Sequence, residues 1–527
     1  MQRQSPILRI NADILWRIFT LNTVEDYRTG LCPLMIAHST SQVCSGWRNM
    51  ILSSPSIWGK IFYLPSLNQT SNAWRNEVLR RSGNALLSIT SEGLGLEDPS
   101  TAFFFFLLEN HLQRMAHVHI MADMDDNISS DPRWKFLRND APNLRDITLM
   151  FDTPVAFLRK IEIGPLFSNN APTLRTLSIA AISYTLGACN FSHVRHLQLS
   201  GNRNGTIMIF KALSNMVGLA SLALDNIEGT EENLQLEEWD TLPRKYFLNL
   251  KEFDFDGKII TASFLLCHID PTPDCRLRLN VTTSGLDLTA SIYISIFKQR
   301  LAVYLKSILA TTIDSGVTNG ISVKLEKDVF VMSSGPNFCT CYTECQISTI
   351  EIHNIDNFEG WPHVPDLVLE PLSSLDLSQL TSLKLLYVYA PEVILNAGFG
   401  KLLFALRKLT EIFTDSMTLW AITNAQRASN NIAFPFLQKI VFCTQHKVLP
   451  RAIMLFLHNR YMGALQRRNE FIRLIDLSEC DIPVEQIVDV LFLNMTAMLR
   501  VLWSQNTINI LGPVPVPPAS QTDSPNH

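Results

Sequence analysis

Leu144-Arg145-Asp146-Ile147-Thr148-Leu149 is the stretch of this sequence that decides the fold, because its pattern returns along the chain. A leucine anchor is followed by two variable residues, an aliphatic residue, one variable residue and a second aliphatic residue. Six further stretches repeat this order, and they begin at Leu174, Val194, Leu219, Leu250, Leu437 and Ile472. In each copy the last two aliphatic residues alternate with other residues, which is the pattern of a β-strand with one buried face.

The spacing of the copies indicates a stack of similar units. Neighbouring copies start roughly 20 to 36 residues apart, a period typical of repeat architectures. Each buried leucine or isoleucine contributes roughly 1.5–3 kcal/mol to stability. In one isolated unit, the conformational entropy lost on folding would offset this gain. Pro142 and Pro172 lie two residues before an anchor, where proline suits a turn that enters a strand. The sequence therefore predicts strands that stack on one another.

The first sixty residues contain two short helical patterns. Asn11 suits a helix N-cap and Asp13 places a carboxylate in the first turn, so a helix over about 12–20 is expected. Ser39, Thr40 and Ser41 offer N-caps for a second helix, and the serines before Pro55 end it. We expect the apolar residues to form one-sided stripes, namely Ile14, Leu15, Ile18 and Phe19 in the first helix and Val43, Trp47 and Ile51 in the second. A piece this short needs a partner or a neighbouring domain.

The N-terminal pattern resembles the F-box, a helical module that docks on a Skp-type adaptor and through it on a cullin ubiquitin ligase. The family pattern reads Leu-Pro-x-Glu-Leu-Leu, Ile-Phe, Val-Cys-x-x-Trp-Arg, Pro-Ser-Leu-Trp and a final Ile. This chain has Asn11 in place of the proline, Asp13 in place of the glutamate and Arg48, Pro55, Ser56 and Ile61 at matching positions. The resemblance implies that the adaptor-binding residues are Ile10, Ile14, Leu15, Ile18, Phe19, Val43, Cys44, Trp47, Ile57 and Trp58.

The repeats resemble the degenerate leucine-rich repeats found behind F-boxes, especially in expanded fungal families. The expected fold is α/β, a three-helix F-box followed by an irregular leucine-rich-repeat-like solenoid with a curved parallel sheet. Ala85–Ile89 is expected to be its first strand, after a helix that carries Trp74 and ends at Gly83. The expected domains are an F-box over 5–65, a linker helix over 66–84, a first solenoid half over 85–288, a helical insertion or seam over 289–345, a second half over 346–511 and a disordered proline-rich tail over 512–527.

Composition narrows the class of partner. The chain has 527 residues, 46% of them hydrophobic and 18% charged, which is an ordinary globular balance. The formal net charge of −5 gives no basic field for nucleic acid, and no apolar run reaches membrane-spanning length, so neither nucleic acid nor membrane is expected as a partner. We expect the protein in the cytoplasm, the nucleus or both.

Three clusters could carry chemistry, but each has a simpler interpretation. Cys339, Cys341 and Cys345 with His353 or His363 lack the paired knuckle spacing of structural zinc, so an inert thiol-bearing loop is preferred. Glu252, Asp254 and Asp256 alternate along a predicted strand and fit its solvent-facing side. His117 with His119, and the acidic residues Asp123, Asp125 and Asp126, are also interpreted as surface residues. No metal or cofactor is expected.

The leading functional hypothesis is a non-catalytic substrate receptor of a ubiquitin ligase. The F-box would dock the adaptor, and the solenoid would bind an unknown protein substrate. Two alternatives stay open at this stage. One is a scaffold or regulatory protein that keeps the helical module without joining a ligase, and the other is a metal-dependent hydrolase that uses the acidic strand positions.

Overall fold

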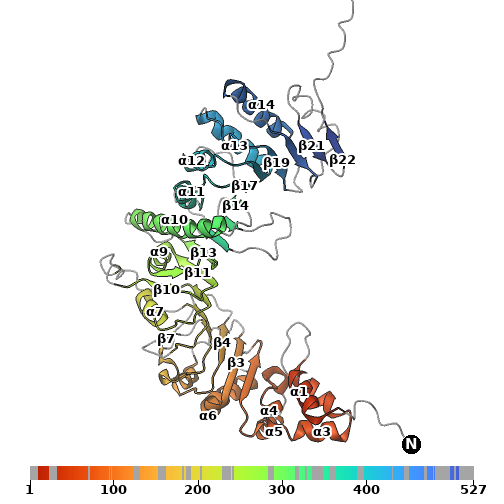
Figure 1. Cartoon of the computed structure of the whole chain (residues 1–527). Coiled ribbons are helices and arrows are strands. Elements are labelled where there is room, and N and C mark those ends of the chain that lie inside the picture. Colours follow the sequence, from red (N-terminus) through yellow and green to blue (C-terminus); the bar gives the residue numbers. More distant parts are fainter. Residues whose placement is uncertain are drawn as a thin grey trace, which may run out of the picture. The chain divides into compact units, whose positions relative to one another are not determined.

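The computed structural model describes residues 10–22, 32–68, 72–93, 95, 98–122, 131–151, 162–180, 183–185, 191–201, 205–227, 239, 242–282, 290–314, 320–326, 329–334, 348–354, 364–388, 397–429, 431–443, 450–467, 472–478, 480, 499–503 and 506–509. The fold is α/β, with a large and mostly parallel sheet (Figure 1). The chain divides into two compact units, Met1–Gly257 with Cys267–Thr272 and Lys258–Leu266 with Pro273–His527. The seam expected over 289–345 lies inside the second unit.

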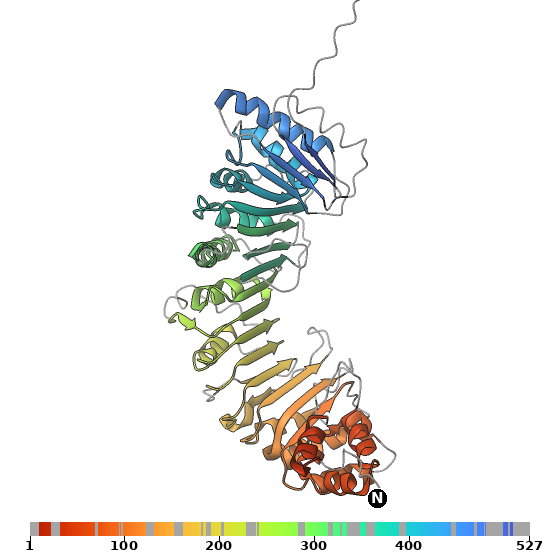
Figure 2. The same ribbon diagram turned by 45° about the vertical axis from the view of Figure 1, so that its right-hand side comes forward.

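The first unit stacks its strands in chain order. Each strand pairs in parallel with the next, and Figure 2 shows the strands as a ladder of arrows with helices along one side. The strands are β1 (Phe62–Tyr63), β2 (Leu87–Ser91), β3 (Met115–Ala122), β4 (Asp146–Phe151), β6 (Thr176–Ala180), β8 (His196–Ser200), β9 (Ser221–Asp225) and β11 (Glu252–Lys258). The connecting helices include α5 (Ala73–Ser82), α6 (Pro99–His111), the 3-10 helices η5 (Pro132–Arg138) and η7 (Leu166–Asn169), and α7 (Gly205–Leu213). Two small pairs lie beside this sheet, β5 (Glu162–Pro165) with β7 (Ser183–Thr185) and β10 (Lys245–Phe247) with β12 (Ile269–Pro271).

A hydrogen-bonded turn precedes the predicted strands, and its residues explain the repeat. The Leu144 N–H donates to the Ala141 carbonyl at 3.2 Å, and Leu174 makes the same bond to Ala171. Pro142 is therefore the second residue of a four-residue turn, the position where a fixed φ is favoured. Equivalent bonds lead into β8, β9 and β11 from Phe191, Met216 and Phe247. Both ends of every one of these turns are buried apolar side chains.

The seven stretches predicted as strands are all strands, so that prediction is confirmed. Each strand begins two residues after its anchor, and the anchor is buried below the sheet. The sequence analysis missed equivalent stretches, although Leu380-Thr381-Ser382-Leu383-Lys384-Leu385 has the same order of anchor and aliphatic residues. That stretch enters strand β17 (Ser382–Val388).

The second unit interrupts this order with an antiparallel meander. Strand β13 (Arg276–Thr282) pairs in parallel with β16 (Ser348–Asn354), β16 pairs antiparallel with β15 (Val329–Ser334), and β15 pairs antiparallel with β14 (Gly320–Glu326). Strand β14 then pairs in parallel with β17. The chain must therefore cross three strand spacings between β13 and β14, about 14 Å, where an ordinary unit crosses one. The long helix α10 (Ala290–Asp314), which lies in the helical insertion expected over 289–345, is part of this connection.

The rest of the second unit returns to parallel strands. They are β17, β18 (Glu411–Thr414), β19 (Lys439–Phe442), β20 (Leu474–Leu477) and β21 (Arg500–Trp503), and β22 (Asn506–Asn509) closes the sheet antiparallel to β21. The accompanying helices are α9 (Ile259–His268), α11 (Val364–Ser373), α12 (Ala397–Ala405), α13 (Ser416–Ser429) and α14 (Pro450–Arg467). Arg460 on α14 is buried and donates to the Ala433, Phe434 and Pro435 carbonyls that precede β19. Burial without a counter-charge lowers the pKa of Arg460 to about 10.

Membrane insertion finds no support in the described helices. Not one of them has both the length and the hydropathy that a bilayer crossing requires. The phenylalanine run in α6 instead builds the core of the first unit, because Phe104 and Phe105 pack against Trp134, with ring centroids 5.8 and 5.0 Å apart. Trp134 also contacts Phe151 of β4 at 5.5 Å.

The N-terminal helices join the first sheet through a close backbone contact at Gly59. These helices are α1 (Ala12–Asn22), α2 (Pro33–Ser41), α3 (Ser45–Leu52) and α4 (Pro55–Trp58), and together we call them the N-terminal module. The Gly59 carbonyl accepts the Ser88 N–H of β2 at 2.8 Å. A methyl group at Gly59 would lie 2.2 Å from the Leu86 carbonyl oxygen, so a side chain does not fit there.

We predict that Gly59→Ala destabilises the first unit by about 1–3 kcal/mol, the usual cost of an overpacked buried contact. The measurement is urea unfolding of the full chain followed by tryptophan fluorescence. Gly46→Ala is the matched control, because Gly46 lies in α3 with only the Cys44 sulfur near, at 3.9 Å. Alanine is the better helix former, so the control should be neutral or stabilising. Equal unfolding midpoints for the wild type and Gly59→Ala would show that this contact does not constrain the fold.

Candidate docking surface of the N-terminal module

Helix α1 carries two apolar stripes that face in different directions. The helix begins as predicted, since the Asn11 side chain accepts the Asp13 N–H at 2.9 Å. Leu15 and Phe19, four residues apart, are buried. Ile14 and Ile18 are also four residues apart but lie about 100° round the helix, and they are 55% and 39% exposed. The four residues expected to form one apolar stripe therefore divide into a buried pair and an exposed pair.

The buried stripe belongs to the module's own core. The Phe19 ring meets Trp47 edge to face, with centroids 4.9 Å apart. Ile57 and Trp58 of α4 are buried as well, and the Trp58 indole N–H donates to the Ile51 carbonyl at 2.9 Å. Leu15, Phe19, Ile57 and Trp58 were all expected to bind an adaptor, but the structure places them inside the chain. They shape the module and leave the contact surface to other residues.

The second helical pattern divides into two helices. The residues expected to cap a helix, Ser39–Ser41, instead end α2, which starts at Pro33. Cys44 is the true N-cap of α3, because its sulfur accepts the Trp47 N–H at 3.4 Å. Val43 precedes that cap and is 58% exposed, so it does not join Trp47 and Ile51 in a buried stripe. Cys44 and Trp47 are half-buried.

The exposed apolar residues form the candidate docking surface. It consists of Ile10 just before α1, Ile14, Ile18 and Leu21 along one side of α1, Met35 on helix α2, which contacts α1, and Val43 before α3. Trp16, also exposed, lies on another side of α1 and is not counted in this surface. Sequence reasoning missed Leu21 and Met35. Leu21 lies seven residues after Ile14, so helical spacing could have found it. Met35 could not be found because the sequence analysis began the second helix after Ser39–Ser41, beyond Met35.

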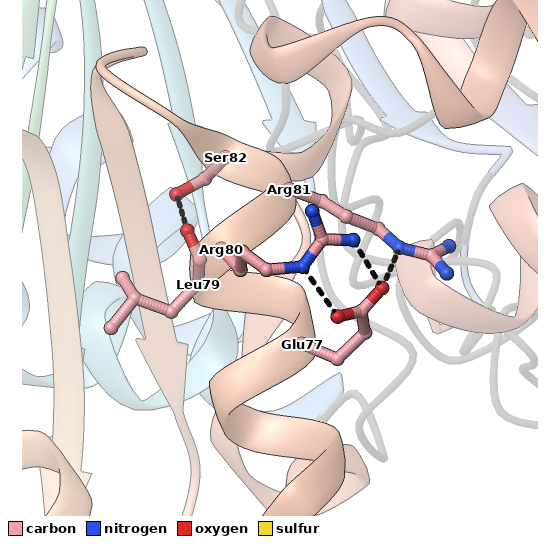
Figure 3. Close-up of polar contacts among 5 residues, drawn as sticks. All are labelled: Glu77, Leu79, Arg80, Arg81 and Ser82. Atoms are coloured by element: carbon pink, nitrogen blue, oxygen red, sulfur yellow. Dashed lines mark hydrogen bonds and ion pairs between the residues drawn. The ribbon is translucent and has the colours of Figure 1, made fainter.

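Helix α5 fastens the module to the first sheet. The Trp58 ring lies beneath the Arg81 guanidinium, 4.6 Å from its centroid, and beside Trp74 at 6.4 Å. Glu77 forms ion pairs with Arg80 and Arg81, each at 2.7 Å. Figure 3 shows these contacts along α5. Gly83 ends this helix with a positive φ of 49°, as the sequence predicted. Asn72 lies at its N-cap, while Thr70 and Ser71 lie outside the described residues.

The candidate metal-binding and acidic clusters do not form a site among the described residues. Cys339, Cys341, Cys345, His363 and the acidic residues Asp123, Asp125 and Asp126 lie outside the described residues, as does the tail over 512–527. Among the residues that are described, no three His, Cys, Asp or Glu side chains come together as a metal site.

The remaining members of those clusters lie on strands. Glu252 accepts the Ser221 hydroxyl, and His353 lies 3.9 Å from Glu351. His117 pairs with Asp146 at 2.7 Å across β3 and β4. Glu252, Asp254 and Asp256 alternate with the buried Phe253 and Phe255 along β11, as predicted. These positions fit the polar side of a sheet.

Comparison with known proteins adds no relative. No protein-family model matches the chain, and no curated protein matches it. The functional argument therefore rests on the residues and their geometry.

We predict that Glu77 makes the attachment of α5 sensitive to acid. Hydrogen bonds from Arg80 and Arg81 lower the pKa of Glu77 from 4.5 to about 2. Its contribution to stability is therefore fully present above pH 4.5 and is lost as the pH falls through about 2. Glu77→Gln should lower the unfolding midpoint at pH 7 and reduce the loss of stability on acidification.

The measurement is urea unfolding at several pH values between 7 and about 2, across the range in which carboxylates titrate. Glu109→Gln is the control, since it removes one exposed carboxylate from α6. If Glu77→Gln and Glu109→Gln follow the same acid profile, the ion pair does not contribute to attachment.

Proposed function

We propose that the protein is a substrate receptor of a ubiquitin ligase, in which the N-terminal module acts as an F-box and docks a Skp-type adaptor. One observation carries this proposal. Helix α1 exposes Ile14, Ile18 and Leu21 on one stripe while the adjacent stripe already fills the module's core. Contiguous exposed apolar surface of this kind is typical of protein interaction sites.

The sequence pattern supports the same proposal. The Cys44-x-x-Trp47-Arg48 element begins a helix, and the Pro55-Ser56-Ile57-Trp58 element forms the next one. In the proposed function the adaptor contacts Ile10, Ile14, Ile18, Leu21, Met35 and Val43, whereas the buried residues hold these helices in place. The adaptor in turn binds a cullin, and other subunits carry out ubiquitin transfer.

The parallel strands fit the second half of the proposal, a leucine-rich-repeat-like surface that binds a protein substrate. Their buried anchors recur at each unit, and most of their outward positions are polar, although Met121 of β3 is exposed. Ser178 donates to Gln198, and Ser200 donates to Asp225 across neighbouring strands. Such a face has few apolar groups that need covering, so it is free to take part in recognition.

We predict that Ile14→Asp with Ile18→Asp abolishes capture of a purified Skp-type adaptor, because carboxylates on this stripe would have to be buried unpaired. The measurement is co-purification of the full chain with adaptor, followed by size-exclusion chromatography. Val217→Asp with Leu248→Asp is the control, since these side chains are 74% and 76% exposed on turns of the sheet. The control should keep adaptor binding.

Both double variants should unfold at the wild-type temperature, because all four side chains are exposed. Failure of the folded wild-type chain to bind any Skp-type adaptor would overturn the proposal. That result would favour a scaffold or regulatory protein that does not join a ligase.

A further inference from the structure

Three exposed arginines lie side by side at the start of consecutive strands in the first unit. Arg145, Arg175 and Arg195 each follow the buried anchor of their unit. The Arg175 N–H donates to the Arg145 carbonyl at 2.6 Å, and the Arg195 N–H donates to the Arg175 carbonyl at 2.7 Å. The backbone therefore holds the three residues in register, about 4.8 Å apart per strand. We call this set the arginine ladder.

The described part of the chain gives the ladder no ion-pair partner. Across the described residues, no ion pair within 4.0 Å joins a ladder arginine to a carboxylate. The nearby carboxylate is Asp146, whose pKa is lowered chiefly by its hydrogen bond with His117, with a smaller effect of Arg175. Like charges aligned on neighbouring strands destabilise a sheet. The ladder is therefore unfavourable for folding and requires another explanation.

In the second unit, arginines on a strand form ion pairs with a carboxylate of the same chain. Arg276 and Arg278 of β13 both pair with Glu351 on the adjacent strand β16, at 3.0 and 2.9 Å. Lys439 of β19 pairs with Glu411 of β18 in the same way. A carboxylate on the neighbouring strand is thus available in this architecture. Among the residues that the structure describes, no such ion pair is found at the arginine ladder.

We infer that the arginine ladder binds a short acidic segment of a partner protein, with carboxylates that pair with the three guanidinium groups. The chemistry follows from the charge, because an arginine guanidinium binds carboxylates in a planar, two-bonded geometry. The length follows from the neighbouring strands. The ladder is bounded by alanines on both sides, because the Ala116 carbonyl accepts the Arg145 N–H at 2.8 Å and the Ala220 N–H donates to the Arg195 carbonyl at 2.7 Å. The aligned arginines therefore span three strands, which suits a short segment.

Identifying the partner as a ligase substrate rests on the proposed function, but the binding of an acidic segment does not.

The probe is a fluorescein-labelled peptide with four glutamates flanked by serine and glycine, measured by fluorescence anisotropy with the full chain. Its counterpart with glutamines in place of the glutamates tests the role of charge. The wild type should bind the acidic peptide, and binding should weaken as salt is raised from about 0.05 to 0.3 M.

The test variant is Arg145→Gln with Arg175→Gln and Arg195→Gln. It should lose at least about tenfold in affinity for the acidic peptide, because the paired cations are removed. The control is Lys211→Gln with Lys306→Gln and Arg407→Gln, which removes the same charge from exposed positions elsewhere. The control should change affinity less than about twofold, the effect of a remote screened charge. Thermal unfolding of both variants establishes that they are folded.

Equal loss in the two triple variants, or no binding by the wild type, would overturn the inference. A phosphoserine peptide of equal charge that binds at least about tenfold tighter would overturn the assignment to carboxylates. Adaptor capture is measured separately on the same protein. A chain that binds the acidic peptide but no adaptor would contradict the proposed function and leave the arginine ladder in place.

Discussion

The structure depends on one recurring constraint, a tight turn whose first and last side chains are both buried. The turn fixes where the strand starts, because the anchor N–H is bonded back to the carbonyl three residues earlier. The residue after the anchor then donates to the preceding strand, as Arg145 does to Ala116 and Arg175 does to Arg145. Each turn therefore sets the register of its own strand against the last one. A single unit gains little from this arrangement, since its anchor is buried only when a neighbour is stacked on it.

The N-terminal module also buries apolar side chains, but it does so in a helical core and not by stacking strands. Its helices are short, and they fill one core with Leu15, Phe19, Ile57 and Trp58. That leaves the Ile14 stripe without a cover among the described residues of the chain. Gly59 and helix α5 hold the module against β2. The exposed stripe of α1 is therefore fixed in place relative to the first sheet. A docking function fits this combination of a firm attachment and an open apolar surface.

Charged residues on neighbouring strands form ion pairs in the second unit, whereas the arginine ladder of the first unit has no ion pair among the described residues. Where Arg276 and Arg278 meet Glu351, the charges are satisfied within the sheet and contribute to its pairing. Where Arg145, Arg175 and Arg195 align, the described residues supply no ion pair, which is the observation behind the proposed ligand. The contrast comes from the residue type on the adjacent strand, because the backbone geometry of neighbouring parallel strands is alike. A receptor whose helical end binds an adaptor and whose sheet binds an acidic segment is consistent with both surfaces.

The sequence by itself determined the seven strands that follow an anchor, the α/β class, the Asn11 cap, the Gly83 helix end and a long helix over 290–314, because each leaves a pattern within a short stretch of the chain. It also pointed to Ile10, Ile14, Ile18 and Val43 as members of an apolar surface. Only the tertiary structure decided which α1 stripe is buried, since two stripes of similar hydrophobicity lie about 100° apart and the choice belongs to α2, α3 and α4. The antiparallel order of β14, β15 and β16 was likewise set by long-range pairing. The arginine ladder could not be predicted from the sequence for the same reason, because residues 20 or 30 positions apart become neighbours only when the strands stack.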